Sequence, residues 1–318
     1  MIQLRHLIRV FTGITLALLP LLSGVVVAGE RKPAGEFWAD SLDAVEVNGT
    51  ALAVLDVGAG EPVILLHGSS ADYRTWCGEV EALKARCRVI AYSRRYHHPN
   101  QGGGDGRDYS VALHERDLLG LMDALKLHNA HLVGYGTGGN IAAQFAVDHP
   151  DRVRSLVLAE TAFPALMKDA PRARDYEDER RLVYEQAYQA LASDFGELGF
   201  QAIANWEFGG EAATLIPRAV QRRLADNVHA LKLQVLSPVR LPPLTLEQLR
   251  GIQCPVLCID GARSPWQAKA MTDELIKCRP ATQRVVLKNV SHGLVWDEPR
   301  GFSRAVTDFI DHPALAGE

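Results

Sequence analysis

The sequence has little of several features that mark specialised classes of protein. Its 318 residues include only five scattered cysteines, too few for the disulfide framework of a small secreted domain. No pair is spaced as CxxC and no cysteine–histidine cluster has metal-ligand spacing, so we expect no metal. The formal net charge of −4 gives no electrostatic reason to expect a nucleic acid partner. With 47% hydrophobic and 23% charged residues, the composition is that of a globular chain.

The longest apolar run lies at the N-terminus. Two arginines precede an uncharged apolar run from residue 10 to 22, and Val26 and Ala28 form an A-x-A-like cleavage site. This order is typical of a secretory signal peptide, and the run is short for a membrane span. We therefore expect residues 1–28 to direct export, so that the protein is periplasmic or secreted. An uncleaved segment that anchors the chain in a membrane is the alternative.

The order of the expected elements indicates an α/β fold. Two short alternating runs joined by Asn48-Gly49 predict a hairpin. Helix and strand then alternate, as expected for a parallel sheet with helices on both faces. The expected strands are residues 43–47, 50–57, 62–66, 88–92, 130–133, 153–158, 256–260 and 283–287, and the expected helices are residues 76–85, 111–125, 140–147, 266–278 and 299–310.

Between residues 163 and 249 the strand signal disappears. This stretch is rich in Arg, Glu, Ala and Leu, with helical spacing of apolar residues at 179–191 and 217–231. We therefore expect a mostly helical insertion in the α/β core.

The segment from residue 131 to 160 is compatible with two functions. Gly134, Gly136 and Gly139 match GxGxxG, and Glu160 follows where a ribose-binding acid would be, so the segment alone could bind a dinucleotide. A dinucleotide-binding motif normally opens its domain, whereas four expected strands precede this one. The β/α pattern also stops after Glu160. We therefore expect no cofactor.

Several motifs occur in an order that points to one known family. The sequence HGSS at 67–70 follows the third expected strand, GYGTGG at 134–139 forms a strand–turn–helix junction, and NVSH at 289–292 precedes the last helix. With this order and spacing, residues 43–310 resemble the lidded members of the α/β-hydrolase superfamily. The resemblance implies an α/β-hydrolase fold with a mostly parallel central sheet, flanked by helices.

The resemblance also implies a division of the chain. Residues 1–28 are the expected signal peptide, residues 29–162 and 250–318 the α/β-hydrolase core, and residues 163–249 a helical lid. Such a protein acts on, or binds, a small molecule.

The position of the family's nucleophile carries no side chain. In the elbow motif G-x-S-x-G, Gly136 stands where the family has serine, so covalent chemistry is lost at that position. Ser264 stands where many members have the acid, whereas Glu160 occupies an alternative acid position of the family. The resemblance therefore implies a dyad in which His292 is the general base and Glu160 orients it, with Asp260 as a less favoured partner.

An oxyanion hole needs only the fold. The resemblance places its backbone N–H groups at Ser69 and Thr137, and we expect the Thr137 side chain to pack at the start of its helix. We expect His97 and His98 to be surface histidines. The residues expected to line the pocket are His67, Gly68, Ser70 and Tyr135.

Four functions are compatible with these residues. The favoured one is an exported enzyme that cleaves a small ester, lactone or similar substrate with His292 as base. The others are a catalytically silent ligand-binding protein, a cofactor-free lyase or oxygenase, and a pseudoenzyme that binds a partner through residues 172–181. In an exported chain Cys254 and Cys278 could also form a disulfide, and free thiols are the equal alternative.

Overall fold

The computed structural model describes residues 38–100, 106–168, 170–193, 195–210, 212–237 and 244–313. By its internal contacts the chain divides into two compact units, Met1–Lys32 and Pro33–Glu318, and every described residue belongs to the second. The expected signal peptide therefore lies outside the described residues. Of the described helices, none is long and apolar enough to cross a membrane.

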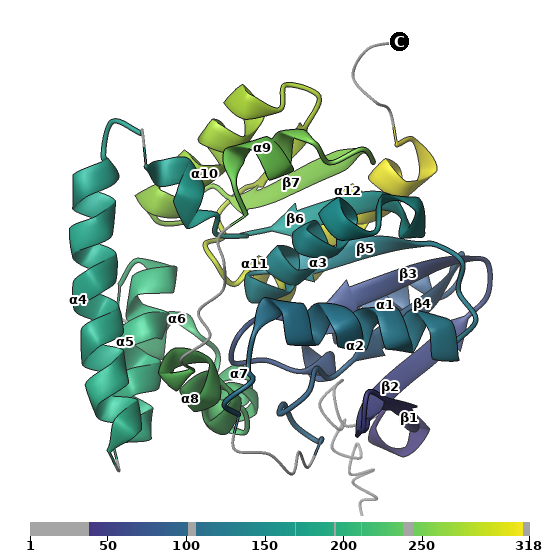
Figure 1. The fold of residues 1–318 in the computed structure, drawn as a ribbon, viewed down its shortest axis with the longest axis horizontal. Helices are drawn as coiled ribbons and strands as arrows, with labels where there is room; N and C mark the ends of the chain where they lie inside the picture. Colours follow the sequence, from purple (N-terminus) through teal and green to yellow (C-terminus); the bar gives the residue numbers. More distant parts are fainter. Residues whose placement is uncertain are drawn as a thin grey trace, which may run out of the picture. The chain divides into compact units, whose positions relative to one another are not determined.

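The described chain forms an eight-stranded sheet in the order β1-β2-β4-β3-β5-β6-β7-β8 (Figure 1). Strand β2 pairs with β1 and β4 in antiparallel orientation, and all other neighbouring strands are parallel. The strands are β1 (Asp43–Val47), β2 (Thr50–Gly58), β3 (Glu61–Leu66), β4 (Cys87–Tyr92), β5 (Ala130–Tyr135), β6 (Val153–Ala159), β7 (Val256–Gly261) and β8 (Gln283–Leu287). The predicted α/β architecture is confirmed.

Local signals set the strands where the sequence predicts them. At the hairpin between β1 and β2, Asn48 and Gly49 have φ values of +45° and +73°, the left-handed conformations that a tight two-residue hairpin turn needs. Strands β5 and β7 are buried at every residue, because helices cover both faces of the sheet.

Two hydrophobic cores lie on the two faces of the sheet. In β3, Ile64 and Leu66 belong to one core while Val63 and Leu65 belong to the other, the alternation that a strand imposes. The first core contains residues of α2 (Val111–Ala124), α3 (Thr137–Asp148), α9 (Leu246–Arg250) and α10 (Trp266–Cys278). The second contains residues of α1 (Cys77–Leu83), α11 (Leu294–Asp297) and α12 (Pro299–Asp311).

The described chain between β6 and β7 contains no strand. We call its helices α4 to α8 the helical insertion, and Figure 1 shows them gathered on the left, beside the sheet. They are α4 (Ala173–Ala192), α5 (Gly196–Phe208), α6 (Ala212–Leu215), α7 (Arg218–Ala225) and α8 (Val228–Leu236).

One helix prediction in this insertion is wrong. The run expected over residues 217–231 is two helices, α7 and α8, which are separated at Asn227. The Asn227 side chain is buried, accepts a hydrogen bond from the His98 N–H (2.8 Å) and donates one to Asp72 (2.7 Å). These bonds to the core hold the chain in a turn where local propensity favours a continuous helix.

All five cysteines are free thiols. The disulfide between Cys254 and Cys278 that the sequence left open is therefore not formed in this structure.

Candidate active site

Gly136 forms the sharp turn between β5 and α3. Its backbone has φ +53° and ψ −120°, a conformation that residues with a side chain adopt only under strain. The Gly136 N–H donates to the Ala159 carbonyl on β6 (2.9 Å), and the Gly136 carbonyl accepts from the Gly139 N–H (3.0 Å) in α3. The turn thus has the geometry of a nucleophile elbow at a position without a side chain.

The neighbouring glycines are present for a different reason. A Cβ on Gly134 would overlap the backbone of Gly139, and a Cβ on Gly138 would overlap the backbone of β3. These glycines allow α3 to pack directly on the strands. Within the described residues, a Cβ added at Gly136 would meet nothing closer than 3.9 Å. Packing therefore does not require glycine at position 136.

The loop after β3 carries the expected oxyanion-hole residue Ser69. The Gly68 carbonyl accepts from Arg94 Nη2 (2.8 Å) and from His67 Nδ1 (2.9 Å). Since the Gly68 C=O and the Ser69 N–H lie on opposite sides of one planar trans peptide, these two bonds turn the Ser69 N–H away from Arg94. The Ser69 hydroxyl is hydrogen-bonded to the Thr137 hydroxyl, so the two expected oxyanion residues are neighbours.

Glu160 and His292 come together at the carboxyl ends of the parallel strands. His292 Nδ1 lies 3.4 Å from Glu160 Oε2. The other carboxylate oxygen, Oε1, accepts from the Gly261 N–H (2.7 Å) and from the Ser264 hydroxyl (2.6 Å). Ser264, at the family's usual acid position, therefore holds the buried Glu160 in place.

Asp260 does not contact His292. Its carboxylate accepts hydrogen bonds from the Thr272 hydroxyl (2.9 Å) and from Arg284 Nε (2.7 Å). Burial, together with the nearby charge of Glu160, raises the pKa of Asp260 to about 6. Among the two acids weighed from the sequence, the geometry joins Glu160 to the histidine.

The imidazole of His292 is enclosed by aromatic rings and a second carboxylate. The Tyr135 hydroxyl donates to the His292 carbonyl (2.9 Å), and the Phe208 ring on α5 packs edge-on with its centre 5.1 Å from that of the imidazole. His292 Nε2 lies 3.8 Å from Glu207 Oε2, also on α5. Burial lowers the pKa of His292, but the hydrogen bond with Glu160 and the charges of Glu207 and Glu160 outweigh it, so the pKa is raised.

Sequence reasoning missed Glu207. It lies on α5, which is outside the two runs of helical spacing in the insertion, and no motif of the family occurs in this part of the sequence. Nothing in the spacing of the sequence connects residue 207 with residue 292; only the packing of the helical insertion against the core brings them together.

These groups line a cavity of about 40 Å³, large enough for water molecules. Its lining residues are Gly68, Ser69, Ser70, Ala71, Tyr135, Gly136, Thr137, Phe200, Ile203, Ala204, Glu207, Phe208, Leu224, His292 and Trp296. Of the residues expected at the pocket, Gly68, Ser70 and Tyr135 line it, whereas His67 is buried beneath the oxyanion loop. Thr137 also faces the cavity, because its hydroxyl bonds Ser69 rather than packing into the start of α3.

The expectation that His97 is a surface histidine is wrong. Its ring is fully buried, with Nδ1 2.8 Å from the Ala71 carbonyl and Nε2 3.2 Å from the Tyr109 hydroxyl. Burial and the charge of Arg94 hold the pKa of His97 well below its ordinary value, so the ring stays neutral and supports the oxyanion loop. His98 is exposed, as expected.

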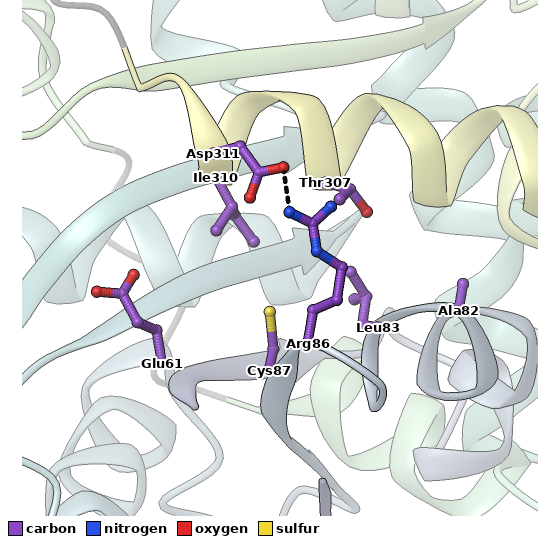
Figure 2. Close-up of a pocket in the computed structure, with 8 residues that line it drawn as sticks. All are labelled: Glu61, Ala82, Leu83, Arg86, Cys87, Thr307, Ile310 and Asp311. Carbon is purple, nitrogen blue, oxygen red and sulfur yellow. Dashed lines mark ion pairs between the residues drawn. The ribbon is translucent and has the colours of Figure 1, made fainter. Parts of the chain in front are cut away.

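A larger hollow, of about 300 Å³, lies at the opposite ends of β3 and β4. Figure 2 shows Arg86 reaching Asp311 on α12, with which it forms an ion pair (2.8 Å). The Cys87 thiol lines the same hollow, and burial raises its pKa, which makes it a poor nucleophile. No histidine lines this hollow among the described residues, so we assign the chemistry to the smaller cavity.

The described residues contain no group of three His, Cys, Asp or Glu side chains placed to hold a metal ion. At the smaller cavity a histidine lies between two carboxylates, beside a turn without a side chain and beside Ser69 and Thr137, whose backbone N–H groups are the expected oxyanion hole. That arrangement supports proton transfer at the histidine and the binding of a developing negative charge at the N–H groups.

Comparisons with known proteins agree with this fold. Residues 61–229 match the family model described as the alpha/beta hydrolase fold. The 2-hydroxymuconate semialdehyde hydrolase of Pseudomonas sp. (strain CF600) is 32% identical over 251 residues, which are 72% of this chain and 83% of that protein. The 2-hydroxy-6-oxo-2,4-heptadienoate hydrolase of Pseudomonas putida is 28% identical over 276 residues, 80% of this chain and 91% of that protein.

The fold is also similar to solved structures. The enol-lactonase from Burkholderia xenovorans LB400 superposes with a TM-score of 0.68 at 21% identity and covers 85% of this chain and 100% of its own. At this level of identity the likeness describes the fold.

Proposed function

Because the chain belongs to the α/β-hydrolase fold family, we propose that it hydrolyses a small organic ester or lactone without a side-chain nucleophile on the elbow. In this proposal His292, oriented by Glu160, is the general base, and water is the nucleophile. The observation that carries the proposal is the contact between His292 Nδ1 and Glu160 beside the bare elbow at Gly136. The hydrolase names of the relatives support a small-molecule substrate.

The contact with Glu160 assigns a role to each nitrogen of the histidine. A proton on Nδ1 is held by the carboxylate, which leaves the lone pair of Nε2 directed into the cavity. Water bound there gives its proton to Nε2 as its oxygen attacks the substrate carbonyl. The imidazolium that results then returns the proton to the departing alcohol oxygen.

The backbone N–H groups of Ser69 and Thr137 are the proposed oxyanion hole. The Gly68 carbonyl is turned toward Arg94 and the Gly136 carbonyl toward the Gly139 N–H. The N–H groups that follow these carbonyls point the opposite way, because each peptide is planar and trans. Each such donor stabilises a transition state of acyl transfer by about 3 kcal/mol.

We propose that residues 163–249 act as a lid over this site. Gln234 of α8 donates to the Ser69 hydroxyl (3.2 Å), and Asn227 bonds the core through Asp72. The cavity of about 40 Å³ is far smaller than the about 300 Å³ of ordinary ligand pockets. Substrate entry therefore requires the helical insertion to shift.

Export is a separate proposal. It rests on the positive, apolar and small-residue segments of residues 1–28. Expression of the full chain in a bacterium, followed by mass determination of the protein in each cell fraction, tests it. A periplasmic or secreted product that begins at Gly29 supports export, and an uncut chain in the cytoplasm contradicts it.

A second candidate function uses the same base on carbon. With no nucleophile on the elbow, His292 could remove a proton from an acidic C–H group, and the oxyanion hole would hold the enolate. The retained base beside an absent nucleophile is the observation that favours this lyase or oxygenase chemistry.

The test of the main proposal is turnover of short acyl esters and lactones by the purified full chain. We expect slow hydrolysis without a burst of acyl-enzyme, and His292→Ala should lower it about a hundredfold or more. The exposed His128→Ala variant is the matched control and should leave turnover unchanged. Equal turnover by the wild type and His292→Ala would refute the proposal.

A further inference from the structure

We propose that Glu207, on α5 of the helical insertion, is a catalytic residue that holds the attacking water together with His292. This inference rests on the proposed hydrolytic function. It assigns to a side chain of the insertion part of the task that a serine on the elbow performs in relatives.

The position of Glu207 is the first observation. The Glu207 side chain lines the active-site cavity and is about one-third exposed, while Ala204 and Phe208 of the same helix are buried in a cluster with Ala71 of the core. Among the described residues, the imidazole of His292 is the polar group that this carboxylate meets. Glu160, the acid on the other side of His292, accepts hydrogen bonds from Gly261 and Ser264, so the two carboxylates beside the histidine are held in different ways.

The distance is the second observation. His292 Nε2 and Glu207 Oε2 are 3.8 Å apart, too far for a direct hydrogen bond and near enough for one water molecule to contact both atoms. The turn at Gly136 leaves the adjoining space open, since an added Cβ would meet nothing closer than 3.9 Å within the described residues. Two acceptors and an open space define a site for one water.

A covalent role for Glu207 is disfavoured on chemical grounds. If the carboxylate attacked an ester, the tetrahedral intermediate would expel the carboxylate far faster than the alkoxide, because the carboxylate is the much weaker base. Accepting a hydrogen bond from water has no such disadvantage.

The step balances as follows. The water donates one hydrogen bond to Glu207 and transfers its other proton to Nε2 of His292, while its oxygen bonds the carbonyl carbon. The negative charge that forms on the carbonyl oxygen is held by the N–H groups of Ser69 and Thr137. The C–O bond to the alcohol then breaks, and the alkoxide takes the proton from His292. Glu207 stays ionised throughout and stabilises the imidazolium.

The electrostatic surroundings of Glu207 determine how the site responds to pH. The groups that face it are His292, Tyr135 on β5 and Tyr184 on α4, with Glu160 behind the histidine. Burial raises the pKa of Glu207, and the positive charge of His292 opposes that rise. The negative charge of Glu207 in turn raises the pKa of His292, so removing it should make His292 lose its proton at lower pH.

The experiment compares Glu207→Gln with Glu197→Gln, a change of an exposed residue on the same helix. Hydrolysis of 4-nitrophenyl butyrate by the full chain is measured from pH 5 to 9. Glu207→Gln should lower kcat about tenfold or more and move the acidic limb of the kcat/KM profile to lower pH. Glu197→Gln should change neither. Glu207→Asp, which keeps the charge, should leave the acidic limb in place and lose part of kcat.

The outcomes separate this inference from the proposed function. If Glu207→Gln keeps both kcat and the acidic limb while His292→Ala abolishes turnover, the hydrolytic function stands and the role of Glu207 is wrong. If Glu207→Gln fails to fold in a thermal unfolding measurement, Glu207→Asp decides: an unchanged kcat, or an acidic limb that moves to lower pH, contradicts the inference. Unchanged turnover in both Glu207→Gln and His292→Ala overturns the function and the inference together.

Discussion

The two nitrogens of His292 face regions of different construction. On the Nδ1 side, Glu160 is fixed by the backbone N–H of Gly261 at the end of β7 and by the hydroxyl of Ser264 in the loop after it. On the Nε2 side, Glu207 comes from the helical insertion, stands 3.8 Å away and borders a cavity. The first side is a closed set of hydrogen bonds and the second is open.

In the proposed function, this difference separates a part of the site that orients His292 from a part that admits water and substrate. Orientation needs fixed partners, so the acid that sets the tautomer of His292 is buried in the core with its hydrogen bonds satisfied. Water and substrate must enter and leave, and the other side is formed by the helical insertion, which we propose shifts relative to the sheet. Three predictions test this comparison, from the largest expected effect to the smallest.

Glu160→Gln should cause the largest loss. The amide is nearly the same size, but it can donate to Nδ1 and so favour the tautomer in which Nε2 carries the proton and cannot act as base. We expect kcat for ester hydrolysis to fall about a hundredfold or more, with little change in KM.

Asp260→Asn is the matched control for that change. Asp260 is a buried carboxylate on the neighbouring strand, but it pairs with Arg284 and Thr272 rather than with His292. It should lower the midpoint of thermal unfolding and leave kcat of the folded protein nearly unchanged. Equal losses of kcat in the two variants would mean that the Nδ1 side has no orienting role.

Gly136→Ser should have an intermediate effect, because it supplies a nucleophile on the open side. The elbow has room for the side chain, and we expect turnover of short esters to rise about tenfold, with a burst of product that reports an acyl-enzyme. The left-handed φ of +53° should cost about 1–3 kcal/mol of stability.

Gly136→Ala isolates the backbone cost of the same change. It should lose as much stability in urea unfolding as Gly136→Ser and gain no turnover. A rise in turnover with alanine, or no burst with serine, would show that a serine hydroxyl at position 136 is not the only feature missing for an acyl-enzyme mechanism on the Nε2 side of His292.

The Nδ1 side could be predicted from the sequence and the Nε2 side could not. Glu160 directly follows β6 and His292 lies in the loop after β8, at positions that the resemblance to the α/β-hydrolase superfamily gives to the acid and the base. Neighbouring parallel strands bring their carboxyl ends together at one edge of the sheet. The turn at Gly136 and the loop at Ser69 follow from the same strand order.

Glu207 has no such constraint. The position of Glu207 depends on how the helices α4 to α8 pack on the core. That packing uses contacts such as the hydrogen bond from Asn227 to Asp72, which no local sequence pattern predicts. The same reason explains why the prediction for His97 is wrong. A histidine in the loop after a strand is expected at the surface, but the oxyanion loop and Arg94 enclose this one. Tertiary contacts, rather than local secondary-structure propensity, determine where Glu207 and His97 lie.

The smallest expected effect is a shift in the pKa of His292, which depends on the carboxylates on both sides of the ring. Carboxylates on either side raise its pKa above the ordinary value of 6.5, although burial acts in the opposite direction. The folded protein therefore holds the proton of His292 more tightly than the unfolded chain does. This difference adds to the free energy of unfolding in full below the pKa of a free histidine, and it is lost as the pH rises through the raised pKa of the folded protein. Activity has the opposite dependence, because the base is the neutral ring, so kcat/KM should rise through the same pH range.

NMR titration of the imidazole should show a midpoint above that of a free histidine in the wild type, and His97, enclosed beside Arg94, should remain neutral across the range. A midpoint for His292 below that of a free histidine would mean that burial outweighs both carboxylates, and that the open side contributes no charge to the reaction.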